Sequence, residues 1–152
     1  MIFDLLTKET IRVNVEVDDW EKAIRASGRL LVDTGAVEER YIQAMIDTAK
    51  EFGHYIVLID GMALAHSRPD MGVNRICLSL ITLKNPVPFG SPEHDPVSVV
   101  FALGALDHSS HLDLIQEMSA LFEDEEKFME VTKCGSPEEV IEKFRSILDQ
   151  AL

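Results

Sequence analysis

The stretch YIVLIDGMALAHSRPDMGVNRICLSLITL, from Tyr55 to Leu83, decides the fold and contains the first candidate for a reactive side chain. Short apolar runs lie on both sides of Asp60-Gly61, and the second run ends at His66. A polar turn then leads into an alternating run at 75–83. Apolar runs bounded by turn residues predict strands, so we expect His66 at a strand end, at the edge of the core. Reactive side chains tend to lie at such ends, where a rigid scaffold holds them.

Hydrophobic periodicity predicts the other elements of the chain. Alternation predicts a half-buried strand at 11–17, and apolar residues at helical spacing predict two helices before the apolar run 55–59. The order is roughly a strand, two helices, three strands and then further helices, which predicts a three-layer α/β/α sandwich around a mixed sheet. The expected ranges are helices at about 19–35 and 38–53, strands at 62–65, 75–83 and 97–103, a proline-rich loop at 84–96, and helices from 111, within 123–129 and from 137.

Helix starts are marked by polar residues that cap free backbone N–H groups. Asp18 is the expected cap of the first long helix, and Ser136 before Pro137 is a strong start for the last one. Ser110 is the expected cap of a helix opened by His111, which leaves His108 outside that helix. The acidic run 123–126 predicts either a short helix or a solvated charged face.

Composition bounds the class of protein. A chain of 152 residues is long enough for one domain with its own core, and we expect residues 1–152 to form a single domain. No apolar run approaches the roughly 20 residues that span a bilayer, and the N-terminus lacks the pattern of a secretion signal. The two cysteines lie far apart, so a disulfide framework is not expected. These features predict a cytoplasmic protein.

The formal net charge of −13 bears on the kind of partner. It argues against nucleic acid and anionic membranes, which both need a basic face. It favours protein partners with a basic docking surface, because complementary charge speeds encounter. Composition leaves open the simpler explanation that acidity only aids solubility.

Histidines are the main candidates for chemistry. The chain has five of them, at positions 54, 66, 94, 108 and 111. His108 and His111 could form a metal site with His66, but no zinc-motif spacing is present, and no metal or cofactor is expected. The sequence also lacks a GxxxxGK[ST] loop and a GxSxG elbow, so neither ATP use nor a hydrolase triad is supported.

The segment from Gly61 to His66 also resembles a known family. It is similar to the phosphorylation-site motif of the IIA proteins of the bacterial phosphoenolpyruvate-dependent sugar phosphotransferase system, in the mannitol–fructose superfamily. Residues 68–70 (Arg-Pro-Asp) and 81–84 (Ile-Thr-Leu-Lys) match the ascorbate-type branch, and the resemblance covers nearly the whole chain. Two departures stand out, since Ala65 replaces a common proline and Thr48-Ala49 replaces the Arg-Glu of the mannitol branch.

The resemblance implies a phosphoryl carrier with the α/β/α fold of that superfamily. His66 would accept a phosphoryl group from the phosphocarrier HPr and pass it to a cysteine of a cognate IIB protein, while a membrane IIC component imports the sugar, ascorbate being the expected one. His111 would be the second active-site histidine, which stabilises the phosphoryl group. Arg68 and Ser67 are the phosphate-binding candidates, although Arg68 could equally form an ion pair with Asp70 or Glu38.

The same features leave two other functions open. One is a regulatory IIA protein that signals through phosphorylation of His66. The other is a non-catalytic module of the same fold that binds an anion in the pocket. The sequence does not decide the oligomeric state, and a homodimer is among the assemblies considered.

Overall fold

A mixed five-stranded sheet forms the middle of the protein. The computed structural model describes residues 1–150, apart from the side chains of His54 and Gln150. The strand order is β1-β4-β5-β3-β2, in which β1 runs parallel to β4, β3 runs parallel to β5, and the pairs β4–β5 and β2–β3 are antiparallel. The strands are β1 (Ile11–Val15), β2 (Val57–Ile59), β3 (Met62–Ala65), β4 (Cys77–Val87) and β5 (Val97–Gly104).

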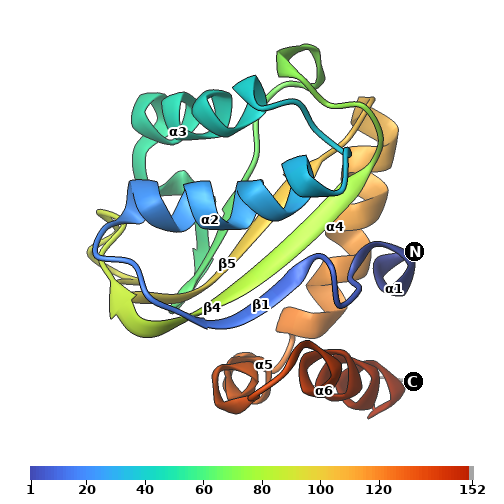
Figure 1. Ribbon diagram of the computed structural model, residues 1–152. Coiled ribbons are helices and arrows are strands. Elements are labelled where there is room, and N and C mark those ends of the chain that lie inside the picture. The colour runs from blue at the N-terminus through green and yellow to red at the C-terminus, as the bar shows by residue number, and fades with distance from the viewer. Residues whose placement is uncertain (151–152) are drawn as a thin grey trace.

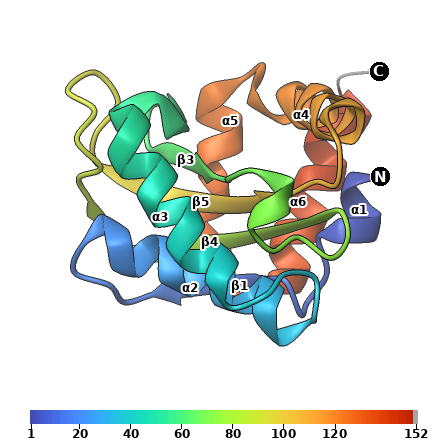
Figure 2. The same ribbon diagram turned by 90° about the horizontal axis from the view of Figure 1, so that it is seen from above.

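Two long helices, α2 (Trp20–Asp33) and α3 (Arg40–Phe52), lie side by side over one face of the sheet (Figures 1 and 2). Their apolar stripes pack with one set of strand side chains in the first of two buried clusters. A Cβ on Gly28 would lie 2.9 Å from both Ile42 Cγ1 and Met45 Cε, so the close approach of the two helices requires a glycine there.

The helices from the two ends of the chain cover the opposite face of the sheet (Figure 1). They are α1 (Ile2–Leu5), α4 (His108–Phe122), α5 (Glu125–Met129) and α6 (Pro137–Gln150). Stacked rings of Phe101, Phe128 and Phe144 lie at the centre of this second cluster, with centroids 5.8–6.5 Å apart. Short 3-10 turns connect the elements: η1 (Gly53–Ile56), η2 (Pro69–Met71) and η3 (Glu130–Lys133).

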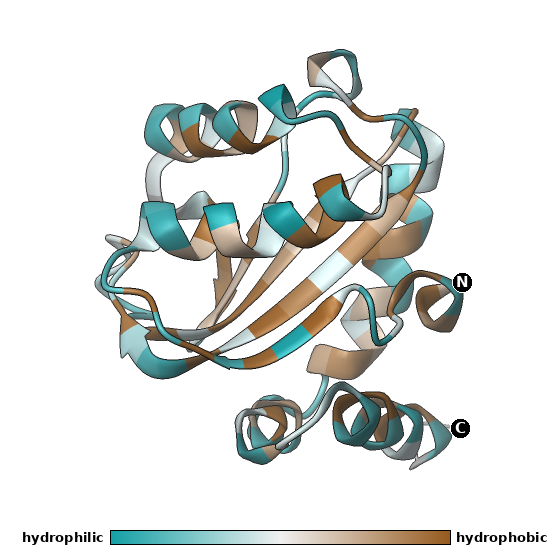
Figure 3. Ribbon diagram, in the orientation of Figure 1, coloured by the Kyte–Doolittle hydropathy of each residue, from teal (hydrophilic) through white to brown (hydrophobic). Residues whose placement is uncertain are grey.

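Side chains alternate along β3, so this one strand contributes residues to both buried clusters. Met62 and Leu64 belong to the second cluster, whereas Ala63 and Ala65 face the long helices in the first. This is the period of two that a pleated strand imposes. Apolar residues are concentrated in the strands, and polar residues lie on the outward sides of the helices (Figure 3). The three-layer sandwich around a mixed sheet is therefore confirmed.

The hairpin between β2 and β3 needs its glycine. Gly61 has a φ of 81°, which is the left-handed region that L side chains rarely adopt. A Cβ there would also approach Met129 Cε to 2.8 Å. The turn therefore fixes the start of β3, the strand that leads to His66.

Several expected boundaries were wrong. The strand predicted at 11–17 ends at Val15, and Asp19 rather than Asp18 caps α2, accepting the N–H of Lys22 at 2.8 Å. Asp18 instead pairs with the Lys22 ammonium. The strand expected at 75–83 begins at Cys77 and extends to Val87, into the predicted loop, where Val87 pairs with Val97 of β5 after an irregularity in the register.

The count of strands after the two helices was also wrong. The apolar run 55–59 contributes a fourth strand, β2, at the edge of the sheet. The short helix in the acidic run and the helix start at Ser136-Pro137 are confirmed as α5 and α6. In the described part of the chain, no helix is long and apolar enough to cross a membrane.

Candidate functional site

His66 and His111 meet because β3 and β5 are parallel neighbours. His66 follows the last residue of β3, and α4, which carries His111, begins four residues after β5 ends. Parallel strands end at the same edge of a sheet, and Ala65 pairs with Ala102. The ring centroids of His66 and His111 are 5.6 Å apart. Residues 45 positions apart in sequence thus share one site.

A hydrogen bond orients the His66 ring. Its Nδ1 lies 3.2 Å from the backbone carbonyl of Leu64. A carbonyl oxygen only accepts, so this bond requires the tautomer with the proton on Nδ1. Nε2 then carries the lone pair and is the nucleophilic nitrogen of the half-buried ring.

The start of α4 differs from the prediction. The helix begins at His108, and Asp107 is its cap, accepting the N–H of Ser110 at 2.7 Å and its hydroxyl at 2.8 Å. The expectation that Ser110 caps a helix opened by His111, with His108 outside it, was wrong because the Asp107 carboxylate is the better acceptor. His111 is the fourth helical residue, and helical side chains lean toward the N-terminus, so its ring still covers the first turn.

The environment of His111 favours the neutral ring. Partial burial lowers the pKa of His111, and the nearby His66 and His108 lower it further. A neutral imidazole can donate one N–H hydrogen bond. His108 and His111 line a hollow of about 220 Å³ together with Ser67.

A buried tyrosine holds the segment after His66 in place. The hydroxyl of Tyr41 donates to the carbonyl of Leu103 at 2.7 Å and accepts the N–H of Ser67 at 2.9 Å. Tyr41 is fully buried, and burial raises its pKa, so the hydroxyl stays protonated. It thus connects α3 both to the end of β5 and to the residue next to His66.

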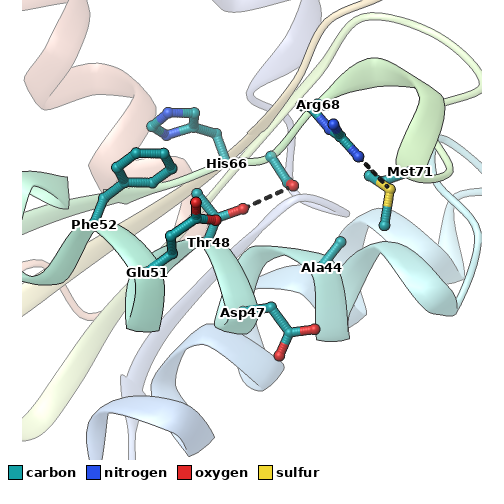
Figure 4. A pocket seen from close by; sticks show the side chains of 9 residues that line it. Ala44, Asp47, Thr48, Glu51, Phe52, His66, Arg68 and Met71 are labelled. Carbon is teal, nitrogen blue, oxygen red and sulfur yellow. Dashed lines mark hydrogen bonds between the residues drawn. The ribbon is translucent and has the colours of Figure 1, made fainter.

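A larger pocket of about 510 Å³ opens on the α3 side of His66 (Figure 4). Its lining comes from α3 and from the segment after β3: Ala44, Asp47, Thr48, Glu51, Phe52, His66, Ser67, Arg68 and Met71. The hydroxyls of Thr48 and Ser67 lie 2.9 Å apart and form a hydrogen bond. Helical spacing predicts Phe52 on the same helix face as Tyr41 and Met45, but as the last residue of α3 it lines the pocket and is 54% exposed.

Arg68 is exposed and has local partners. Its Nε lies 3.6 Å from Asp70 Oδ1, and its guanidinium also contacts Met71 Sδ at 3.5 Å. Of the two ion pairs considered for Arg68, the one with Asp70 is present, whereas Glu38 pairs with Arg40. An exposed pair of this kind is weak, on the order of 0–1 kcal/mol, so the guanidinium remains available to an anion.

Of the histidines with described side chains, His94 lies away from the site. His94 lies at the other end of β3, where its Nδ1 is 2.6 Å from Asp60 Oδ1, and this hydrogen bond raises the pKa of His94. Among the described side chains, no group of three His, Cys, Asp or Glu residues is placed to hold a metal ion.

Tyr41 and Thr48 were missed as site residues. Helical spacing predicts that both lie on one face of their helix, and Thr48 stood out only as a departure from the Arg-Glu of the mannitol branch. No signal in the sequence shows that the α3 face borders the residue after His66, because that contact depends on the fold.

Comparison of the sequence and the fold with known proteins identifies the family of this protein. Residues 4–147 match the family model "Phosphoenolpyruvate-dependent sugar phosphotransferase system, EIIA 2". The chain belongs to this family and is a phosphoryl-transfer component of the phosphotransferase system. The family resemblance stated from residues 61–66 is therefore confirmed.

Relatives and solved structures agree with this family. The chain is 37% identical over 139 residues to the ascorbate-specific PTS system EIIA component of Escherichia coli, covering 91% of this chain and 90% of that protein. A crystal structure of a putative PTS IIA (PtxA) from Streptococcus mutans superposes with a TM-score of 0.85 at 33% identity, covering 93% of this chain and 91% of that one. The mannitol IIA in a complex with phosphorylated mannitol IIB from Escherichia coli superposes with a TM-score of 0.80 at 26% identity, covering 93% and 97%.

Proposed function

We propose that His66 is the residue on which this protein carries the phosphoryl group. The observation that carries the proposal is the pairing of His66 and His111 at 5.6 Å, at the edge where β3 and β5 end. A half-buried imidazole with its Nδ1 proton bound by Leu64 presents Nε2 to an incoming phosphorus atom. In the transfer, the Nε2 lone pair forms the N–P bond while the bond from phosphorus to the donor breaks, and the donor keeps that electron pair.

The surrounding residues would stabilise charge on the transferred group. Phosphoryl transfer asks the protein mainly for positioning and electrostatic stabilisation. His111, neutral because its pKa is lowered, donates a ring N–H to a phosphoryl oxygen. Arg68 releases its weak contact with Asp70 and binds a second oxygen, and Ser67 is the remaining phosphate-binding residue.

The proposed partners are HPr as the donor and a cognate IIB protein as the acceptor, with a membrane IIC component served indirectly. The relative that superposes in complex with a phosphorylated IIB supports the second of these. Exposed apolar side chains offer a docking surface: Phe52 lines the pocket with His66 and the acidic Asp47 and Glu51, and Leu112 follows His111 in α4. With a net charge of −13, this surface suits partners with a basic face.

The proposed sugar is ascorbate, and the proposed location is the cytoplasm. The ascorbate branch is supported by 37% identity to the ascorbate-specific relative and by residues 68–70 and 81–84. We further propose that residues 1–152 act as one domain, of which the last two lie outside the described residues. No feature of the site favours the regulatory or anion-binding alternatives over transfer.

A reconstituted relay tests this function. The phosphorylated protein should transfer faster to an ascorbate-type IIB than to a mannitol-type IIB, because residues 68–70 and 81–84 match the ascorbate branch. Equal rates to both, or a preference for the mannitol type, would refute the branch. Absence of transfer to any IIB would favour the regulatory alternative instead.

A further inference from the structure

We infer that the hydroxyl of Thr48 is a further ligand of the phosphoryl group on His66. This inference rests on the proposed function and adds a contact from α3, on the side of His66 that borders the larger pocket. Thr48 Oγ1 lies 2.9 Å from Ser67 Oγ, and both residues line this pocket together with His66 (Figure 4).

The number of hydroxyl hydrogens shows that the Thr48–Ser67 pair has one free donor. Two hydroxyls carry two hydrogens, and their mutual hydrogen bond uses one of them. Within the described part of the chain, neither Thr48 Oγ1 nor Ser67 Oγ has another hydrogen-bond partner. One hydroxyl hydrogen of the pair is therefore available to an acceptor that enters the pocket. A phosphoryl group brings oxygen acceptors and negative charge.

Either hydroxyl of the pair can be the donor, and the backbone at Ser67 is held in place. Its N–H donates to Tyr41 Oη at 2.9 Å, and its hydroxyl meets Thr48 Oγ1 of α3. We assign Ser67 Oγ as the donor to Thr48 Oγ1, which leaves the Thr48 hydrogen for the phosphoryl oxygen. Ser67, named above as a phosphate-binding residue, then acts on the phosphoryl group indirectly, through Thr48, and Tyr41 positions Ser67.

The composition of the pocket explains why a neutral donor matters there. Asp47 and Glu51 come from the same helix and also line it, and both are exposed. Their carboxylates would oppose a phosphoryl group, because like charges in a shared site repel. The hydroxyl of Thr48 is the donor that α3 contributes between them.

The decisive experiment measures the equilibrium of phosphoryl exchange between HPr and this protein, for the wild type and for Thr48→Val. Valine keeps the shape of threonine and removes the hydroxyl. Hydrogen bonds to charged groups are strong enough that its loss should lower the equilibrium constant roughly tenfold. Thr48→Ser keeps a hydroxyl donor, so its equilibrium constant should lie close to that of the wild type. The ³¹P resonance of the phosphohistidine should also move in Thr48→Val.

A matched control separates this role from a general effect on the fold. Thr132 is another half-buried threonine, whose hydroxyl bonds to the carbonyl of Met129 at 2.9 Å, away from the site. Thr132→Val should leave the exchange equilibrium unchanged.

The outcomes distinguish this inference from the proposed function. An unchanged equilibrium constant in a folded Thr48→Val protein whose His66 still carries phosphate would overturn the role of Thr48 alone. A loss in Thr48→Val that Thr48→Ser fails to reverse would show that packing, not the hydroxyl, is responsible, and would also overturn it. A wild-type protein that accepts no phosphate would overturn both.

Discussion

The imidazole rings of His66 and His111 lie with their centroids 5.6 Å apart and their planes tilted by 52°. At this separation the two rings are neighbours, and among the described residues no hydrogen bond joins them directly. Two nitrogens can therefore act on the same phosphoryl group in different roles.

The first prediction concerns His111. His111→Ala should remain folded and slow phosphoryl transfer by about a hundredfold, because losing one preorganised donor in an oxyanion site costs about 3 kcal/mol. Stopped-flow transfer between HPr and the variant measures this effect. His108→Ala removes an exposed histidine from the same helical turn and should change the rate much less. Wild-type rates in both directions for His111→Ala would show that His111 has no role in transfer.

The second prediction is a pH dependence of stability that belongs to His111. Its pKa is lowered in the folded protein, so the unfolded chain binds more protons between that pKa and the ordinary value of 6.5. The contribution to stability is therefore complete above about 6.5 and is lost as the pH falls toward the folded pKa. His94 has a raised pKa and contributes with the opposite sign.

The contributions of His111 and His94 to the pH dependence of stability partly cancel. The contribution of His111 is therefore measured as the difference between the wild type and a variant without that histidine. Free energies of unfolding from urea titrations should be compared between the wild type and His111→Gln across pH 5–8. The wild type should gain stability relative to the variant as the pH rises through this range. A difference that stays flat or falls with pH would contradict a depressed pKa.

The third prediction concerns Tyr41, which joins α3, Ser67 and β5. Tyr41→Phe leaves the Ser67 N–H and the Leu103 carbonyl without this partner, which should cost about 1–3 kcal/mol of unfolding free energy. Amide hydrogen exchange at Ser67 should accelerate more than the global change in stability explains. Exchange at Ser67 that changes only as much as the rest of the sheet would mean that Tyr41 does not hold this segment.

The sequence predicted well whatever depends on local patterns. Alternation and helical spacing gave the layers, and the serine-proline signal gave the start of α6. His66 was expected at a strand end and lies directly after β3. The start of α4 was misplaced by three residues because two capping residues, Asp107 and Ser110, lie three positions apart, and pattern alone does not rank them.

Contacts that depend on strand order could not be read from the chain. The approach of His111 to His66 follows from the parallel pairing of β3 and β5, which are separated by β4 in sequence. The exposure of Phe52 and the contact between Thr48 and Ser67 depend in the same way on where α3 lies over the sheet. Helical spacing assigns a residue to a face of its helix but does not say what that face meets.

The most direct test of the account is phosphorylation of the wild type and His66→Ala by phosphoenolpyruvate, enzyme I and HPr, followed by ³¹P NMR of the labelled protein. The wild type should gain one acid-labile phosphate, attached to Nε2 because Nδ1 is bound to the Leu64 carbonyl. His66→Ala should gain none while keeping its circular dichroism spectrum and melting transition. Labelling of a folded His66→Ala protein to the wild-type level would contradict the central claim.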